Sequence, residues 1–248
     1  KFPSIMQFSE TFLLNNELTG GKQFLFVVME FCPYVDLFDF YSQFGDSKIS
    51  DDQICSIAYQ ALTILNILHK ARVVHHDVKP ANFLVYSLSP LVLKITDFEF
   101  SVQLSKDELT EQPLGTRFYE APELLSCQPH DMSVDIWALG MMLYELTAKK
   151  FPFNLREEQS QRFIIKLRIE KNQLQFDDSF DNPLFKDLLS KMLEKDPSQR
   201  INAENALKHP YFENYNSDVQ YAKQMARSYS QSALDDLDEK EKTDINSV

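Results

Sequence analysis

Glycine is scarce in this sequence, which has only 5 glycines among 248 residues. Loops that wrap closely around a phosphate group need several glycines near one another, because only glycine lets the backbone approach closely and adopt positive φ angles. No G-x-G-x-x-G motif occurs anywhere in the chain. A glycine-rich phosphate loop is therefore excluded from the residues at hand.

Cysteines and long apolar runs are also few. The three cysteines, Cys32, Cys55 and Cys127, are far apart and odd in number, which argues against a disulfide framework or a structural zinc site. No apolar run is long enough to span a bilayer, and no signal peptide is visible. These absences predict an intracellular location, cytoplasmic with the nucleus as a second choice.

Basic residues are outnumbered, with 25 Lys and Arg against 37 Asp and Glu, so the net charge is −12. This charge disfavours nucleic acids and anionic membranes as partners and favours basic ones, although acidic proteins are often acidic merely for solubility. The hydrophobic fraction of 44% is ordinary for a globular protein, and the length suits one large domain or two small ones.

The apolar pattern predicts both strands and helices. The helix at 51–70 should begin with a capping box formed by Ser50 and Gln53. The helix at 134–148 is apolar nearly all round and should therefore be central and buried. The other predicted elements are a loop or hairpin at 15–22, a buried strand at 24–31, strands at 83–86 and 91–98, a long loop at 99–120, and helices at 183–195 and 204–212.

Four polar residues stand among apolar neighbours in a pattern that suits phosphoryl transfer. That chemistry needs metal ions to hold the phosphates, a carboxylate to orient and deprotonate a hydroxyl, and a cation on the transferring group. Asp77 and Lys79 lie two residues apart, so they point to the same side of an extended chain. Asn82 offers a hard oxygen suited to Mg²⁺, and Asp97, at the end of a strand-like run, can supply a second.

Several motifs around these residues resemble those of eukaryotic protein kinases. HHDVKPANFL (75–84) resembles the catalytic loop H-R-D-x-K-P-x-N of the serine/threonine branch, and TDFE (96–99) resembles D-F-G. GTRFYEAPE (115–123), DIWALG (135–140) and DPSQR (196–200) resemble later motifs in the family's order. Together they are very specific, and they resemble most the calcium/calmodulin-dependent-kinase-like group.

The resemblance implies roles for individual residues. Asp77 would be the catalytic base, Lys79 the partner of the transferring phosphate, and Thr116 a contact of both. Asn82 and Asp97 would bind Mg²⁺. In the last of the motifs, the arginine of this family pairs with the glutamate of A-P-E, so the resemblance also implies a buried structural ion pair between two further residues, Glu123 and Arg200.

The resemblance also implies an ATP site. Met29 would lie at the back of the adenine pocket, and the backbone of Glu30 and Cys32 would hydrogen-bond the adenine. Leu84 would form the floor of the pocket, and Asp36 would reach the ribose. For Met29 and Leu84, plain core packing is the alternative, and for Asp36 it is a solvated loop acid.

The implied fold is α+β, a two-lobed protein kinase-like fold with a complete α-rich C-lobe and a truncated β N-lobe. The kinase domain would cover 1–212, with an N-lobe remnant and hinge at 1–32 and the C-lobe at 33–212, followed by a polar acidic tail at 213–248. The family's strand lysine and helix glutamate, which hold the ATP phosphates, are missing.

Two interpretations of this departure remain open. The sequence is either a fragment of a longer kinase, which Lys1 at its start favours, or a shortened relative without transfer activity. The corresponding functions are an ATP-dependent protein serine/threonine kinase that uses Mg²⁺, and a catalytically inactive kinase-like binding or scaffold module.

Two substitutions depart from the family motifs, and one acid bears on the substrate. His76 replaces the usual Arg of H-R-D, and Glu99 replaces the Gly of D-F-G. Glu145 lies where relatives that prefer basic substrates keep an acid, and the net charge points the same way. The sequence thus predicts protein substrates with serine or threonine near basic residues.

Overall fold

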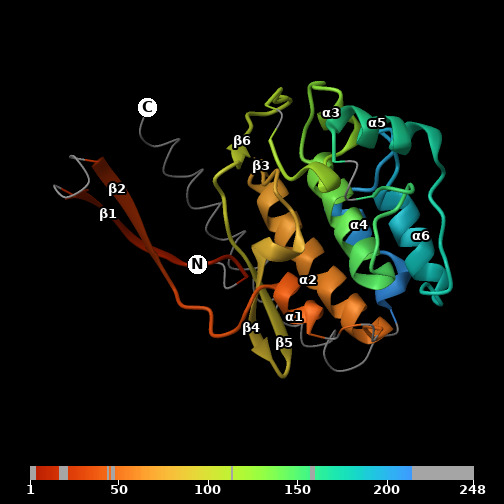
Figure 1. Ribbon diagram of the computed structural model, residues 1–248, viewed down its shortest axis with the longest axis horizontal. Helices are drawn as coiled ribbons and strands as arrows, with labels where there is room; N and C mark the ends of the chain where they lie inside the picture. The colour runs from red at the N-terminus through yellow and green to blue at the C-terminus, as the bar shows by residue number, and fades with distance from the viewer. Residues whose placement is uncertain are drawn as a thin grey trace, which may run out of the picture.

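The computed structural model describes residues 4–16, 22–43, 45, 48–112, 114–156 and 160–213. Helices dominate these residues, and a single hairpin stands apart from them (Figure 1). The strands are β1 (Phe8–Asn16), β2 (Lys22–Met29), β3 (Val73–Val74), β4 (Phe83–Leu88), β5 (Leu91–Ile95) and β6 (Val102–Gln103). The α-helices are α1 (Leu37–Ser42), α2 (Asp51–Lys70), α3 (Pro122–Leu125), α4 (Ser133–Ala148), α5 (Arg162–Lys171), α6 (Pro183–Met192) and α7 (Ala203–Leu207).

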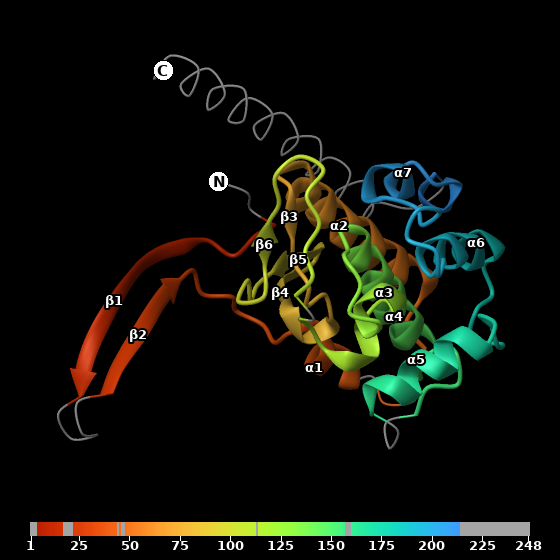
Figure 2. The ribbon, with the colours of Figure 1, turned by 90° about the horizontal axis from the view of Figure 1, so that it is seen from above.

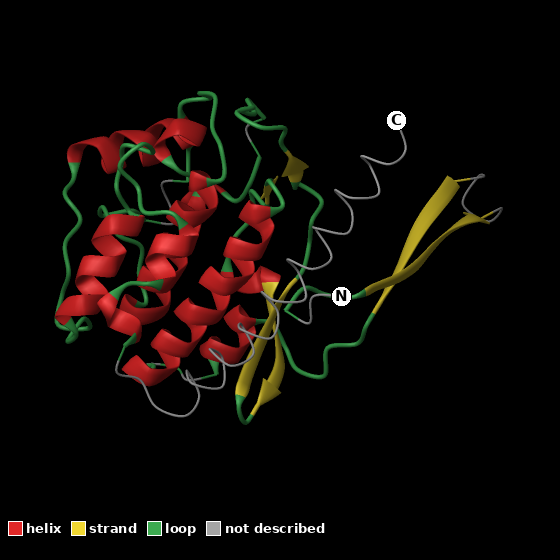
Figure 3. Cartoon of the chain, turned by 180° about the vertical axis from the view of Figure 1, so that it is seen from behind, coloured by secondary structure: helices red, strands yellow, loops and turns green. Residues whose placement is uncertain are grey.

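Two long helices, α2 and α4, form the centre of the helical body, by which we mean the described residues from Leu37 to Phe212 (Figures 1 and 3). Helix α2 begins as predicted, because Ser50 and Gln53 form a complete capping box. Helix α4 is buried nearly all round, which confirms its predicted central position. Burying these apolar faces against each other supplies most of the driving force for this part of the fold.

Short antiparallel strand pairs hold the loops that carry the candidate site. β4 pairs with β5, and β3 pairs with β6. The first pair confirms that both predicted strands exist, although the strand predicted at 91–98 ends at Ile95. The second lies partly within 99–120, so the long loop predicted there contains a short strand and a 3-10 turn at Arg117–Tyr119.

The strand predicted at 24–31 exists as β2, but the prediction that it is buried is wrong. β1 and β2 pair only with each other among the described strands, and Figure 2 shows the hairpin extending away from the helices. Leu25 is 64% exposed, and the rings of Phe12 and Phe26 stack on each other at 5.1 Å. An apolar strand becomes buried only where another layer covers it, and no described element covers this one.

The remaining predicted elements differ in detail. The helix predicted at 204–212 is split into α7 and a 3-10 turn at Pro210–Phe212, since proline cannot donate the next helical hydrogen bond. Most of the loop predicted at 15–22 and, apart from Glu213, the tail predicted at 213–248 lie outside the described residues. Among the helices of the described residues, none has the length and apolar character needed to cross a membrane.

Candidate active site

Asp77 lies at the centre of a compact hydrogen-bonded group. Lys79 Nζ donates to Asp77 Oδ2 at 2.6 Å and to Thr116 Oγ1 at 2.9 Å. Thr116 Oγ1 in turn donates to Asp77 Oδ1 at 2.6 Å. Asn82 Nδ2 donates to the Asp77 carbonyl at 2.7 Å and to Asp77 Oδ2 at 2.9 Å. Three residues of the catalytic-loop motif and one from a segment 37 residues beyond Lys79 thus meet at one carboxylate.

These contacts keep the Asp77 carboxylate ionised. Burial by itself would raise the pKa of Asp77, because a low-dielectric environment disfavours the charged form. Hydrogen bonds from Lys79 and Thr116, the Lys79 charge and the Asn82 amide outweigh burial, so the pKa lies below its usual value. At neutral pH the group therefore presents a carboxylate that can accept a proton.

Asp135 of α4 holds the backbone of this loop in place. Its carboxylate is fully buried and accepts the N–H groups of His75 and His76, both at 2.9 Å. His69 Nε2 at the end of α2 donates to Asp135 Oδ2 at 3.0 Å. The sequence interpretation did not assign this role to Asp135, although an acid inside the otherwise apolar DIWALG run was a signal, since buried acids are normally paired.

The two candidate metal ligands lie at the same end of the β4–β5 pair. The Thr96 N–H donates to the Asn82 carbonyl at 3.0 Å, so Asp97 follows immediately after a residue bonded to Asn82. Both side-chain hydrogen bonds of Asn82 to Asp77 use its Nδ2, which leaves Oδ1 as its acceptor atom. Asp97 is exposed and has a left-handed φ of 63°. Amide and carboxylate oxygens of this kind suit Mg²⁺.

Four of the five predicted adenine-site residues, all except Met29, contact or belong to the β4–β5 pair. Asp36 and Leu84 form a β-bridge, and the Asp36 carboxylate also caps α1 by accepting the Asp39 N–H. Cys32 Sγ donates to the Val85 carbonyl at 3.1 Å. Met29, predicted at the back of the pocket, is 45% exposed.

Lys94 is a further residue of this region that the sequence interpretation missed. It is 4% exposed, and its Nζ donates to both carboxylate oxygens of Glu30 at 2.6 Å. The same carboxylate accepts the Gln7 N–H at 2.7 Å. Glu30 is therefore fixed from two sides, and a lysine inside an apolar strand was the sequence signal for it.

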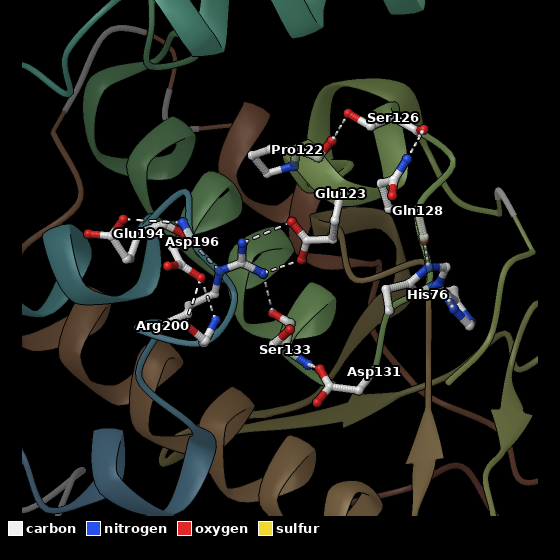
Figure 4. A network of polar contacts seen from close by, with 12 residues as sticks. His76, Pro122, Glu123, Ser126, Gln128, Asp131, Ser133, Glu194, Asp196 and Arg200 are labelled. Carbon is white, nitrogen blue, oxygen red and sulfur yellow. Dashed lines mark hydrogen bonds and ion pairs between the residues drawn. The ribbon is translucent and has the colours of Figure 1, made fainter. Parts of the chain in front are cut away.

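The predicted ion pair between Glu123 and Arg200 is present and almost fully buried. Arg200 Nη1 and Nη2 contact Glu123 Oε1 and Oε2 at 2.6 and 3.1 Å, and Arg200 Nη1 also donates to the Ser133 carbonyl (Figure 4). Two parallel bonds of this kind fix the relative orientation of both side chains. The pair joins the start of α3 to the segment before α7.

A second ion pair, half-buried and absent from the sequence interpretation, holds the segment after Thr116. Arg162 of α5 contacts Glu120 through two nitrogens, at 2.8 and 2.9 Å. Beside it, the Tyr119 hydroxyl donates to Glu145 Oε2 at 2.6 Å. Glu145 therefore contacts the segment 115–123, which resembles the loop of the family that receives the substrate residue and is the candidate substrate segment. Glu145 also lines a cavity together with Pro80 and Lys149.

The fold and this site define the class of protein. The sequence profile of the family described as "Protein kinase domain" matches residues 1–212. The chain belongs to the protein kinase family, as the catalytic-loop motif indicated.

Individual relatives place the chain in the serine/threonine branch. The phosphorylase b kinase gamma catalytic chain, liver/testis isoform, of Bos taurus is 33% identical over 200 residues, which cover 78% of this chain and 48% of the relative. CDPK-related kinase 5 of Arabidopsis thaliana is 32% identical over 200 residues, which cover 77% of this chain and 32% of the relative. The serine/threonine-protein kinase Nek3 of Oryza sativa subsp. japonica is 30% identical over 202 residues, which cover 82% of this chain and 34% of the relative. The predicted likeness to the calcium/calmodulin-dependent-kinase-like group is confirmed. The chain spans about half the length of the phosphorylase kinase chain and about a third of the length of CDPK-related kinase 5.

Proposed function

We propose that the protein transfers the γ-phosphate of ATP to serine or threonine hydroxyls of proteins. The observation that carries this proposal is the group around Asp77, in which an ionised carboxylate, a lysine and a threonine are bonded to one another. A phosphoryl transfer site needs a base for the hydroxyl and a cation at the transferring group, and these residues supply both.

Asp77 accepts the proton of the attacking hydroxyl in this proposal. Its lowered pKa makes it a carboxylate at neutral pH, and it lies next to Lys79, whose charge faces the phosphate to be transferred. Thr116 connects both and belongs to the segment that would hold the substrate. The site orients its groups in advance, which is the main contribution that such a protein makes to this reaction.

Asn82 Oδ1 and the Asp97 carboxylate are the proposed ligands of Mg²⁺. When bound, the ion neutralises charge on the phosphates. Asn82 is held by its two bonds to Asp77, so its free oxygen points away from the carboxylate that serves as base. This separates the metal-binding atom from the proton-accepting atoms of the same group.

The adenine end of ATP is proposed to bind between the connector at Glu30 to Asp36 and Leu84. Lys94 fixes the Glu30 side chain, which supports the use of the adjacent backbone for hydrogen bonds to adenine. In this proposal Met29 lies at the back of the pocket, the backbone of Cys32 hydrogen-bonds the adenine, and Asp36 reaches the ribose.

The proposed substrates carry serine or threonine near basic residues. The net charge of −12 and the position of Glu145 beside the substrate segment support this preference. A peptide array that varies the residues around a single serine tests it. Equal phosphorylation of acidic and basic peptides would remove the preference and leave the proposed reaction unaffected.

The second candidate function is a binding module without transfer activity. The exposed apolar side chains of the β1–β2 hairpin favour it, because such surfaces commonly mark contacts with other proteins. The two functions differ in phosphate transfer, which only the kinase performs.

The test measures ATP binding and phosphate transfer separately. Asp77→Asn should leave binding of ATP with Mg²⁺ within a few-fold and reduce transfer to a serine peptide by about 10²–10⁴-fold. Asp178→Asn, which makes the same change at an exposed position, is the matched control. Wild-type protein that binds ATP and transfers nothing, under conditions where a known kinase works, would reject transfer and favour the binding module.

A further inference from the structure

Two histidines meet directly behind the catalytic loop. His76 precedes Asp77 in the chain, and His130 lies just before α4. Their side chains approach edge to face, with Nε2 of one 3.0 Å from Nε2 of the other. His76 is 5% exposed and His130 is 4% exposed, so water cannot satisfy these nitrogens.

The Nδ1 atoms of both rings are hydrogen-bonded to backbone carbonyls. His76 Nδ1 lies 3.0 Å from the Phe100 carbonyl oxygen, and His130 Nδ1 lies 2.9 Å from the Gln128 carbonyl oxygen. Since a carbonyl oxygen only accepts, each Nδ1 must carry a hydrogen. A neutral imidazole has a single N–H, so two neutral rings would leave two bare Nε2 lone pairs facing each other.

One additional proton resolves this conflict. If one Nε2 is protonated and the other is bare, all three contacts become hydrogen bonds and the pair carries a single positive charge. A second additional proton would place two N–H groups against each other and is disfavoured. We propose that His76 and His130 share one proton, and that this proton positions the catalytic loop against the segment from Phe98 to Thr110.

The charges around the pair come from several elements. Asp135 of α4 lies against His76 and accepts its backbone N–H, while His69 of α2 donates to the same carboxylate. His75 is the neighbouring titratable group in the loop, and it accepts the Asp77 N–H through Nδ1. The Asp77 carboxylate itself is engaged by Lys79, Thr116 and Asn82.

Burial and these charges act on His76 in opposite directions. Burial lowers the pKa of His76, Asp135 and the Phe100 carbonyl raise it, and His130 and His75 lower it further, so the pKa lies below its usual value. His76 therefore gains a second proton at a lower pH than an unperturbed histidine would.

The pair connects three parts of the site. Thr110 and His130 exchange both backbone hydrogen bonds, at 3.0 and 2.9 Å, which ties the loop to the segment before α4. The Gln128 N–H donates to the Glu123 carbonyl, so the contacts continue to the Glu123–Arg200 pair; Figure 4 draws His76 in this network. On the other side, a Cβ at Gly115 would lie 2.5 Å from the His76 carbonyl, so the substrate segment packs directly on this residue.

The experiment that tests the shared proton is a ¹⁵N NMR titration of the histidine side chains of the full chain between about pH 5 and 8. We expect both rings to keep a protonated Nδ1, and the two Nε2 signals to move together as the pair takes up one proton. His130→Gln should abolish this joint step. His209→Gln, at a buried histidine whose Nε2 faces Asp187 instead, is the matched control and should leave it unchanged.

Two results would overturn the shared proton. One is a pair that stays neutral at both Nε2 atoms over the whole range. The other is a His76 signal that titrates identically in wild type and His130→Gln, since independent histidines share no proton.

The positioning effect has its own measurement. The backbone amide signals of Phe100 and Thr110 should shift with the same midpoint as the pair. In His76→Asn, the amide nitrogen can still donate to the Phe100 carbonyl, and residue 76 no longer titrates. Amide shifts with the midpoint of the wild-type pair should therefore vanish, while the rest of the spectrum is preserved. Amide shifts that persist in His76→Asn would reject the positioning role. Neither readout depends on phosphate transfer, so failure of the proposed function would leave this inference intact.

Discussion

The β1–β2 hairpin and the helical body contain similar apolar side chains and bury them to very different extents. Leu25 in the hairpin is 64% exposed, whereas Leu139 in α4 is fully buried. Both lie in short apolar runs. In α4 the run is surrounded by other helices, and in β2 it faces one partner strand only. The comparison shows that apolar residues specify a preference for burial and that neighbouring layers decide whether it is fulfilled.

The two regions also handle polar groups differently. Inside the body, Asp135 and Arg200 are buried and have several partners each. At the junction with the hairpin, Glu30 and Lys94 form a pair in which the glutamate side chain stays 23% exposed. Stability therefore concentrates in the body, and the candidate ATP site lies on the border between a rigid region and a less covered one.

The largest expected effect comes from breaking a buried ion pair of the body. Arg200→Ala leaves the Glu123 carboxylate buried without its partner and should lower the free energy of unfolding by about 3–5 kcal/mol. Urea unfolding followed by the fluorescence of Trp137, the single tryptophan, measures this change. Lys208→Ala, which removes one side of an exposed pair with Glu204, should leave the midpoint unchanged. Equal shifts in the two variants would contradict the special role of the buried pair.

The next prediction compares the helical body with the β1–β2 hairpin by one leucine-to-alanine substitution in each. Leu139→Ala should lower the free energy of unfolding by about 2–5 kcal/mol, because it leaves a cavity in the core. Leu25→Ala should change it by less than about 0.5 kcal/mol, because its side chain is already largely in water. The same unfolding measurement serves both variants. A large effect of Leu25→Ala would show that the hairpin is covered in solution.

A smaller effect is expected at the junction. Lys94→Met removes the cation that fixes Glu30, and under the proposed function it should weaken binding of ATP by about tenfold, or roughly 1.4 kcal/mol. Binding of ATP to folded protein, measured by calorimetry, checks this. Lys166→Met on α5, far along the chain from Glu30, is the control and should leave affinity unchanged. Lost stability with unchanged affinity would restrict Lys94 to a structural role.

The smallest effect concerns an ion pair at the surface of the body. The Lys150 side chain, 2.6 Å away, and the Ser179 N–H lower the pKa of Asp177 to about 2. Because the folded state favours the ionised form, the pair contributes above the ordinary carboxylate pKa, and its contribution is lost as the pH falls toward 2.

This contribution should be below about 1 kcal/mol, since both side chains are partly exposed to water. Thermal unfolding of Lys150→Met and wild type, compared at about pH 6 and about pH 3, measures it. The difference between the two proteins should shrink at the lower pH. A difference that grows on acidification would show that Asp177 gains nothing from Lys150.

Much of the candidate site followed from local sequence. The spacing of Asp77 and Lys79 predicted side chains on the same side of the chain, and Lys79 donates directly to Asp77. The capping residues Ser50 and Gln53 predicted the start of α2, because capping depends on residues only three apart. Short-range geometry of this kind is determined by the chain itself.

Other features depended on residues that are distant in sequence. Asp135 reaches a loop about 60 residues earlier, and Lys94 reaches Glu30 across 64 residues. An acid in an apolar run indicated that Asp135 is paired, and a lysine in an apolar run indicated the same for Lys94. Neither signal identified the partner residue. The contact between His76 and His130 left no such hint, because two histidines 54 residues apart are close only once α4 and the catalytic loop have packed.

The sequence by itself determined the long helices α2 and α4, the order of the motifs and the membership of the family, since these depend on local pattern and residue identity. Tertiary structure alone decided which groups are buried, which charges are paired and which protons are shared. The physical reason is that burial and pairing depend on what lies opposite a residue in space. Leu25 and Leu139 are the same residue type with opposite exposure for this reason.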